Sequence, residues 1–292
     1  MVSIGFIGAG TVGTALAVRL KEKGYPVVAV ASRTLASAEK LAATVTGCKV
    51  YPSKQEAAAA AELIFVTTPD DAIAQVVAEL GWRPGQSVVH CSGAASLDIL
   101  EPARIGGARV GAFHPLQTFA SVAHAVENIP GSTFALEAEG ELLETLKGLA
   151  TALDGTWVRL GAGDKVLYHA AAVIACNYLV TLLKLATDLW QLFGVGTEEA
   201  TRALLPLLRG TVNNLENVGL PHCLTGPVAR GDLGTITKHL EALERSAPEI
   251  ASTYRELGLK TIPVALGKGK IDDNRAEELR QLLVGVFEEK KR

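Results

Sequence analysis

A short apolar run followed at once by three spaced glycines constrains the fold of this chain most. Ile4-Gly5-Phe6-Ile7 is the run, and Gly8-Ala9-Gly10-Thr11-Val12-Gly13 has the spacing G-x-G-x-x-G. Between a strand and a helix, such glycines permit a tight turn, close approach of a pyrophosphate, and packing of the helix on the strand. The helix N-terminus then offers free N–H groups to phosphate. We therefore expect a dinucleotide-binding βαβ unit, with Gly8, Gly10, Thr11, Val12 and Gly13 as cofactor contacts.

The end of the second expected strand, Val27 to Ala31, indicates which dinucleotide binds. NAD-specific sites place Asp or Glu there, about 20 residues after the glycines, to hold the ribose 2′-OH. This chain has Ser32-Arg33-Thr34 instead, with no carboxylate. Arg33 can pair with a 2′-phosphate, and Ser32 and Thr34 can donate hydrogen bonds to it. The sequence therefore predicts NADP(H) rather than NAD as cofactor. The alternative is that Arg33 is merely exposed to solvent.

Further strands and helices alternate through the first half of the chain. Apolar runs predict strands at 63–67, 87–91, 109–113, 132–136 and 157–160. Such alternation is typical of βαβ units in a doubly wound, mostly parallel sheet with helices on both faces. After Gly161-Ala162-Gly163, a candidate flexible joint, only helical patterns follow. We predict an α/β Rossmann domain over 1–162 and an all-helical domain over 163–292.

Polar residues follow three of these strands. Because parallel strands end at one edge of the sheet, where ligands bind, these residues are expected to meet there. The predicted contacts to the ribose and nicotinamide half of the cofactor are Thr68, Pro69, Ser92 and Gly93. His114 is held extended by Pro115, and it is expected either to contact substrate or to bond a local backbone group.

The start of the second half carries the candidate catalytic residues. Lys165 and His169 are four residues apart, so they share one helix face. Carbonyl reduction needs a proton for the forming alkoxide and gains from a cation beside it. Each of two adjacent cations would also lower the pKa of the other. Asn177, two turns on in apolar surroundings, is a third candidate, because a buried amide must find partners. Alternatively, Lys165 is solvated and His169 is a core histidine.

Two other segments of the second half allow alternative interpretations. Arg230, in the loop from Leu224 to Asp232, could clamp a substrate carboxylate as a bidentate donor or simply pair with Asp232. The run from Val166 to Leu183 approaches the roughly 20 apolar residues of a membrane span. Because polar residues interrupt it, we interpret it as the buried central helix of the second domain, and expect no membrane span.

Composition excludes several classes of protein. Hydrophobic residues make up 48% and charged residues 20% of the chain, as in folded globular proteins. With a net charge of −3 and no basic patch, nucleic acid is not an expected partner. The four cysteines form no C-x-x-C pair, so we expect no metal site and a reducing compartment. No secretory signal is recognisable at the start, which favours the cytoplasm. Cys91 lacks an evident base and is interpreted as a buried small hydrophobe.

Over nearly its whole length the chain resembles oxidoreductases that join a Rossmann-like domain to a helical domain of unknown function. The segments Phe113-His114-Pro115 and Gly226-Pro227-Val228-Ala229-Arg230-Gly231-Asp232 carry this resemblance most specifically. More widely, the chain is similar to the 6-phosphogluconate dehydrogenase-like superfamily, which includes ketopantoate, pyrroline-carboxylate and deazaflavin-dependent NADP reductases. β-Hydroxyacid dehydrogenases of this superfamily have an asparagine four residues after the catalytic lysine, where this chain has His169.

The resemblance implies a homodimer joined through the helical domains, with the substrate in the interdomain cleft. The leading hypothesis is an NADPH-dependent reductase of a small carbonyl compound, such as a 2-keto acid like ketopantoate, or of an imine. Two alternatives are a non-catalytic NADP(H)-binding sensor and a deazaflavin-dependent NADP reductase.

Overall fold

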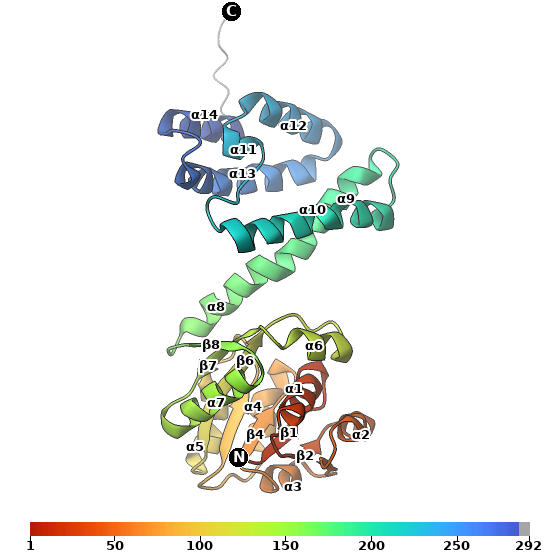
Figure 1. Cartoon of the computed structure of the whole chain (residues 1–292), viewed down its shortest axis with the longest axis vertical. Helices are drawn as coiled ribbons and strands as arrows, with labels where there is room; N and C mark the ends of the chain where they lie inside the picture. The colour runs from red at the N-terminus through yellow and green to blue at the C-terminus, as the bar shows by residue number, and fades with distance from the viewer. Residues whose placement is uncertain (286–292) are drawn as a thin grey trace, which may run out of the picture. The chain divides into compact units, whose positions relative to one another are not determined.

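The computed structural model describes residues 1–285 of the chain. These residues belong to two compact units, Met1–Asn177 and Tyr178–Arg292 (Figure 1). The first unit therefore includes the stretch from Gly163 to Asn177, which the sequence predicts as part of the helical domain.

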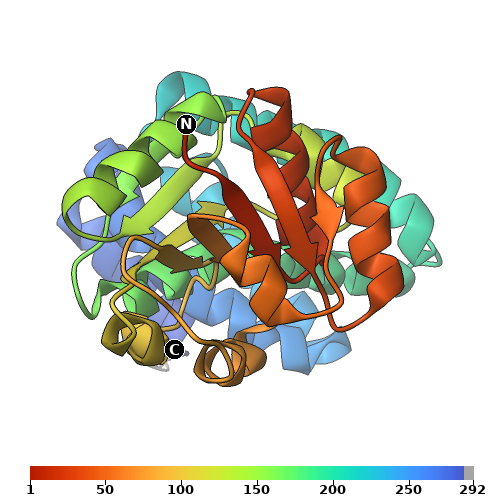
Figure 2. The ribbon, with the colours of Figure 1, turned by 90° about the horizontal axis from the view of Figure 1, so that it is seen from below.

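The first unit is built on an eight-stranded sheet in the order β3-β2-β1-β4-β5-β6-β7-β8. The strands are β1 (Ile4–Ile7), β2 (Val27–Ala31), β3 (Lys49–Val50), β4 (Leu63–Val66), β5 (Ser87–His90), β6 (Arg109–Leu116), β7 (Thr133–Glu137) and β8 (Thr156–Arg159). Only the β6–β7 pair is antiparallel. Figure 2 shows β1, β2 and β3, in red to orange, side by side at one end of the sheet. The predicted doubly wound, mostly parallel Rossmann sheet is confirmed.

Helices cover both faces of this sheet. Their bounds are α1 (Thr11–Glu22), α2 (Leu35–Thr44), α3 (Lys54–Ala59), α4 (Asp70–Ala78), the 3-10 turn η1 (Leu97–Leu100), α5 (Glu101–Ile105), α6 (Val122–Asn128) and α7 (Gly140–Ala152). One core cluster packs α1, α2, α6 and α7 on one face, and a second packs α3, α4, η1 and α5 on the other. Because strand side chains alternate between faces, the central strands are apolar throughout rather than patterned.

A row of aromatic rings links the central strands on the first of these faces. Phe6 stacks on Phe65 at 5.2 Å between ring centroids, Phe65 meets Phe113 edge-on at 5.7 Å, and Phe113 lies 4.6 Å from Phe134. All four rings are fully buried. Aromatic pairs at these separations add to the free energy of burial. The row fixes β1, β4, β6 and β7 relative to one another, and with them the residues at their ends.

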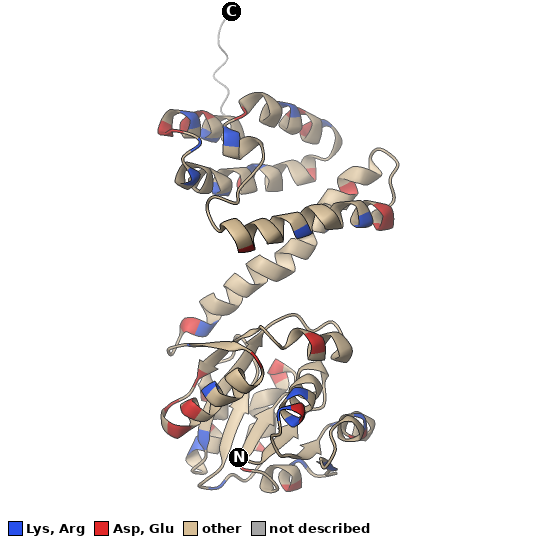
Figure 3. Ribbon diagram, viewed as in Figure 1, with Lys and Arg blue, Asp and Glu red and all other residues tan. Residues whose placement is uncertain are grey.

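The apolar run of the second half forms an exposed helix rather than a buried one. It comprises α8 (Asp164–Ala172), a π-helical turn η2 (Val173–Asn177) and α9 (Tyr178–Gln191). Leu167 is 78% exposed and Val180 69% exposed, so the predicted buried central helix is wrong. The pattern of apolar residues indicates a helix that packs against a partner surface, but it does not say whether that surface belongs to the same chain. Figure 3 shows charges only towards its two ends.

By length and composition alone, the helix Asp164–Gln191 could cross a membrane. The remaining helices of the second unit are α10 (Thr197–Val218), α11 (Pro227–Arg230), α12 (Leu233–Ser246), α13 (Pro248–Lys268) and α14 (Asp273–Val284). Their core is formed by Ile236, Leu240, Ile262, Ala276 and Leu279. The predicted all-helical region after the sheet is confirmed for the described residues.

Candidate active site

The glycine turn after β1 has the geometry that its sequence predicts. Gly8 has a φ of +111°, and a Cβ there would lie 2.7 Å from the Thr67 carbonyl carbon. A Cβ on Gly13 would overlap Thr67 Oγ1 and lie 2.7 Å from Gly8 O. Thr67 Oγ1 donates a 2.8 Å hydrogen bond to that same Gly8 oxygen. Two of the three glycines are therefore needed for close packing between β1, α1 and β4.

Gly10 differs, because a Cβ there would meet nothing within 4 Å. It precedes α1, whose first turn contains Thr11 and Val12, no acidic residue, and no side-chain cap. The N–H groups of this turn are thus available to an anion. Nearby, Thr68 Oγ1 is buried without a hydrogen-bond partner in the described part of the chain. Open space at Gly10, a free helix N-terminus and an unpaired hydroxyl fit a dinucleotide pyrophosphate and ribose.

The end of β2 also fits the predicted 2′-phosphate. Arg33 is exposed and forms no ion pair within residues 1–285. Thr34 is the N-cap of α2, yet its hydroxyl makes no capping bond, and α2 has no acidic residue in its first turn. Ser32 lies between Arg33 and the strand and is half-buried. These groups could hold a phosphate without breaking any existing interaction.

The loop after β5 is tied to α4 by Ser92. Ser92 Oγ donates a 2.5 Å hydrogen bond to Asp70 Oδ2 and accepts one of 3.0 Å from the backbone N–H of Ala95. Pro69, another predicted cofactor contact, is the N-cap of α4. Ser92 therefore shapes this edge of the sheet through bonds within the protein, and its contact with cofactor stays a prediction.

His114, Tyr168 and His169 gather around Gly93 at the same edge. Tyr168 Oη lies 2.8 Å from His114 Nδ1. A Cβ on Gly93 would lie 2.7 Å from His169 Cδ2 and 2.8 Å from His114 Nε2. The missing side chain of Gly93 thus leaves room for both imidazoles. The side-chain partner of His114 is a tyrosine on α8, not the local backbone group that was the alternative.

Burial sets the protonation of this cluster. Burial, and then His169 and Lys165, lower the pKa of His114 to about 4. Burial raises the pKa of Tyr168 to about 12. At neutral pH, His114 is therefore uncharged and Tyr168 keeps its proton. Tyr168 can therefore act as a proton donor, with the neutral imidazole of His114 as its hydrogen-bond partner.

Lys165 lies on the other side of the β5 loop and is only 4% exposed. Its Nζ donates a 2.8 Å hydrogen bond to Ala95 O and lies 3.3 Å from His90 Nε2 and 3.6 Å from Glu137 Oε2. Burial lowers its pKa, and Glu137 acts in the opposite direction. The main cause of the lowered Lys165 pKa is thus burial, and not the neighbouring His169 as expected. The solvated-lysine alternative is also excluded.

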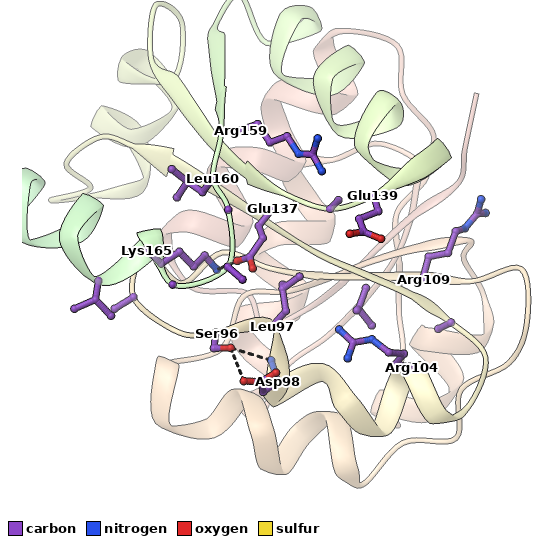
Figure 4. A pocket seen from close by; sticks show the side chains of 18 residues that line it. Ser96, Leu97, Asp98, Arg104, Arg109, Glu137, Glu139, Arg159, Leu160 and Lys165 are labelled. Atoms are coloured by element: carbon purple, nitrogen blue, oxygen red, sulfur yellow. Dashed lines mark hydrogen bonds and ion pairs between the residues drawn. The ribbon is translucent and has the colours of Figure 1, made fainter.

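Lys165 and Glu137 line one end of a cavity of about 750 Å³ between η1, α5 and the ends of β7 and β8 (Figure 4). The figure shows Glu137 directed towards the Lys165 amine, while Arg159 points away.

The two remaining predicted site residues, Asn177 and Arg230, are both exposed. Asn177 is exposed at the end of the π-helical turn, so the expected buried amide is wrong. Arg230 is exposed in the second unit, with Nη2 3.8 Å from Asp232 Oδ2. Asp232 in turn caps α12 by accepting from the Thr235 N–H at 3.0 Å. The simple pairing that was the alternative for Arg230 is therefore present.

Sequence reasoning missed His90, Glu137 and Tyr168 as site residues. His90 ends a strand otherwise rich in valine, and Tyr168 directly precedes His169, so both carried a local signal. Glu137 ends a strand just beyond the predicted bound, and nothing local separates it from an exposed glutamate. Only the pairing of His90 with Ala112, and of Ala112 with Glu137, places it opposite His90.

Two family models match this chain. A Rossmann-like domain family matches residues 1–115, and DUF2520, a domain of unknown function, matches residues 132–261. The predicted combination of a Rossmann-like domain with a domain of unknown function is confirmed. No curated protein matches the sequence.

Solved structures of similar proteins cover nearly the whole chain. A putative NADP oxidoreductase from Bacteroides fragilis is 28% identical with a TM-score of 0.70, covering 90% of this chain and 98% of its own. A Thermotoga maritima protein is 26% identical with a TM-score of 0.65, covering 97% and 99%. A reductive aminase from Aspergillus terreus, in complex with NADPH and ethyl levulinate, is 21% identical with a TM-score of 0.65, covering 98% and 99%. These neighbours support the predicted enzyme class, an NADP-dependent oxidoreductase, and the predicted cofactor, NADP(H).

Proposed function

We propose that this protein is an NADPH-dependent reductase of a small carbonyl or imine compound. The observation that carries the proposal is the gathering of His114, Tyr168 and His169 around Gly93. This cluster lies at the carboxyl edge of the sheet, the edge to which Gly10 and Arg33 also belong. A reductase needs a cofactor cradle and a proton source at one edge, and a plain nucleotide-binding protein needs only the first.

Bound NADPH would supply a hydride to the electrophilic carbon of the substrate. The α1 N-terminus after Gly10 would hold its pyrophosphate, and Ser32, Arg33 and Thr34 its 2′-phosphate. Tyr168 keeps its proton at neutral pH and could donate it to the reduced oxygen or nitrogen. A neutral His114 with its proton on Nδ1 would then donate a hydrogen bond to the tyrosinate oxygen over their 2.8 Å contact, and a proton from solvent would restore the hydroxyl. A 2-keto acid remains one candidate substrate, for which Arg230 is the proposed carboxylate partner.

Titration with NADPH and NADH, followed by nucleotide fluorescence, tests the cofactor. We expect tighter binding of NADPH, weakened at least tenfold by Arg33→Ala, or about 1.4 kcal/mol. Arg159→Ala is the matched control, because Arg159 is also exposed but lies on β8, at the other end of the sheet. Equal weakening by both variants, or no binding of either nucleotide, would overturn the cofactor proposal.

NADPH oxidation against a panel of keto acids, ketones with amines, and cyclic imines tests the reaction. Tyr168→Phe and His169→Ala should lose turnover while still binding NADPH. A non-catalytic sensor would bind NADPH and oxidise none with any substrate. A deazaflavin-dependent reductase would instead oxidise NADPH only when a deazaflavin is added. Either result would contradict the proposed reduction of a carbonyl or imine.

We also propose that the protein is a homodimer joined through the helical region. The exposed apolar side chains of α8, η2, α9 and α10 are not covered within their own units; they include Val166, Leu167, Ile174, Val180, Leu207 and Val212. Large apolar side chains exposed in this number on neighbouring stretches of chain are typical of an interface. Light scattering should give twice the chain mass of 30.6 kDa, and Leu167→Glu with Val180→Glu should give monomers. A chain that floats with lipid vesicles would favour membrane contact instead.

A cytoplasmic location is also proposed, because the four cysteines are free thiols and thiols stay reduced there. Cell fractionation tests it.

A further inference from the structure

A backbone hydrogen bond determines which ring nitrogen of His90 carries the proton. The backbone N–H of Ser92 donates a 3.1 Å hydrogen bond to His90 Nδ1. This nitrogen must therefore carry a lone pair, and a neutral imidazole with an unprotonated Nδ1 carries its proton on Nε2. His90 is fully buried, and burial together with Lys165 and His114 lowers its pKa to about 3. At neutral pH, Nε2 is thus an N–H donor.

That donor faces Lys165 Nζ at 3.3 Å. A protonated ammonium has three donors and no acceptor. A charged Lys165 would therefore place its own N–H groups against the Nε2–H of His90, with no acceptor for either donor. An uncharged amine has one lone pair and two N–H groups. Its lone pair can accept from His90 Nε2–H, and one of its own N–H groups can donate to Ala95 O at 2.8 Å. The second can point to Glu137 Oε2 at 3.6 Å.

We propose that His90 acts as a positioning residue that holds Lys165 as an uncharged amine at neutral pH. His90, Ala112 and Glu137 pair in a row across β5, β6 and β7. The small side chain of Ala112 separates the two larger ones, and Lys165 Nζ lies in the gap between them, 3.3 Å from His90 Nε2 and 3.6 Å from Glu137 Oε2. Depth in this gap and the facing N–H of His90 both disfavour the ammonium form.

The other ionisable groups around this amine differ in whether they favour the charged form of Lys165. Glu137 on β7, Asp70 on α4 and Cys91 after β5 favour the charged form of Lys165, whereas His90 and His114 do not. Glu137 is the nearest carboxylate, yet 3.6 Å is long for a charge-assisted hydrogen bond. The two shortest contacts of Nζ are with the Ala95 carbonyl oxygen at 2.8 Å and with His90 Nε2 at 3.3 Å, and an uncharged amine can satisfy both.

An uncharged Lys165 would also affect which substrate binds, a step that rests on the proposed function. With Lys165 and His114 uncharged and Asp70 and Glu137 nearby, the described residues around the β5 loop attract a cation more than an anion. A protonated imine carries a positive charge, which a charged lysine would repel. The arrangement therefore favours an iminium substrate over a 2-keto acid.

Nitrogen NMR of the whole protein tests the proton placement without cofactor or turnover, so its failure is distinct from failure of the proposed function. Long-range proton–nitrogen spectra of histidine-labelled protein should show His90 with a bare Nδ1 and a protonated Nε2 from pH 5 to 9. The other five of the six histidines serve as internal references. An Nδ1–H form of His90 would overturn the proposal.

Titration of lysines labelled with carbon-13 at Cε gives the second readout, with Lys165→Met identifying the signal. Lys165 should titrate below the surface lysines in the wild-type protein. His90→Gln offers an acceptor oxygen to Nζ and should move the midpoint upwards; Glu137→Gln removes a carboxylate and should move it downwards. A midpoint shared with the surface lysines, or shifts in the same direction, would contradict the proposal. If His90→Gln fails to fold, the wild-type histidine spectrum still decides.

Discussion

Thr67 Oγ1 donates a 2.8 Å hydrogen bond to the carbonyl oxygen of Gly8, joining the end of β4 to the turn after β1. The two residues are separated by 59 positions in the chain. Their contact explains why the glycines of this turn are not equivalent. Gly8 and Gly13 are enclosed by Thr67, whereas Gly10 faces open space. This difference separates a folding role from a binding role within one motif.

Alanine substitution at Gly13 should therefore lower mainly the stability of the protein, whereas alanine substitution at Gly10 should lower mainly its affinity for NADPH. Gly13→Ala forces a methyl group against Thr67 and Gly8, so it should destabilise the protein by about 1–3 kcal/mol. Gly10→Ala should change stability by less than about 1 kcal/mol but weaken NADPH binding at least tenfold, because its methyl group occupies the space proposed for the pyrophosphate. Urea denaturation and NADPH titration measure the two effects. Unaltered NADPH binding by Gly10→Ala would argue against a cofactor at this turn.

Gly93→Ala should disturb the histidine cluster. The added methyl group would lie within 3 Å of both His114 Nε2 and His169 Cδ2, so the imidazoles must move. Loss of general acid–base chemistry typically lowers turnover by about 10²- to 10⁴-fold, and kcat should fall within that range. Gly148→Ala, in α7 with nothing near its Cβ, is the control and should keep full turnover. Equal kcat values for the two variants would remove this cluster from the reaction.

Acid should destabilise the first unit through its buried histidines. In the folded protein the pKa of His90 is about 3 and that of His114 about 4, against about 6.5 in an unfolded chain. The unfolded state thus binds more protons between these values, and stability falls as pH decreases below about 6.5. Each histidine contributes a slope of about 1.4 kcal/mol per pH unit near pH 5.

His114→Gln should remove the contribution of one histidine to the pH dependence of the free energy of unfolding. Urea unfolding between pH 5 and 7, followed by tryptophan fluorescence, measures it. A Trp190→Phe background leaves Trp82 and Trp157, which both belong to the first unit. Parallel pH profiles for the His114→Gln variant and its parent would show that His114 is protonated in the folded protein.

Two of the cysteines should resist alkylation. Burial raises the pKa of Cys48 to about 11 and that of Cys91 to about 12, and the thiolate is the reactive form. Mass spectrometry after native iodoacetamide treatment at pH 8 should find both unmodified, with all four cysteines modified after denaturation. Cys91→Ser should retain turnover. Rapid labelling of Cys91 would reopen its interpretation as a nucleophile.

Local patterns predicted much of the first unit. The strands β1 and β2 were placed at their observed bounds, because a buried strand is a short apolar run ended by glycine or polar residues. The two-residue β3 and the short helices α3, α5 and α6 were missed, since they are too brief to show a period. The exposed α8–α9 helix was misjudged for another reason. An apolar stripe requires a partner, and sequence alone does not identify the partner.

The sequence by itself determined the glycine turn, the basic end of β2 and the change from strands to helices, because each depends on residues adjacent in the chain. The tertiary structure decided the chemistry around Lys165. Its partners, His90 and Glu137, come from two strands that are not neighbours, and they face each other only because β6 lies between them with Ala112 in register. Helix spacing placed Lys165 beside His169. Sheet register placed its amine beside His90, and this contact decides whether the lysine carries a charge.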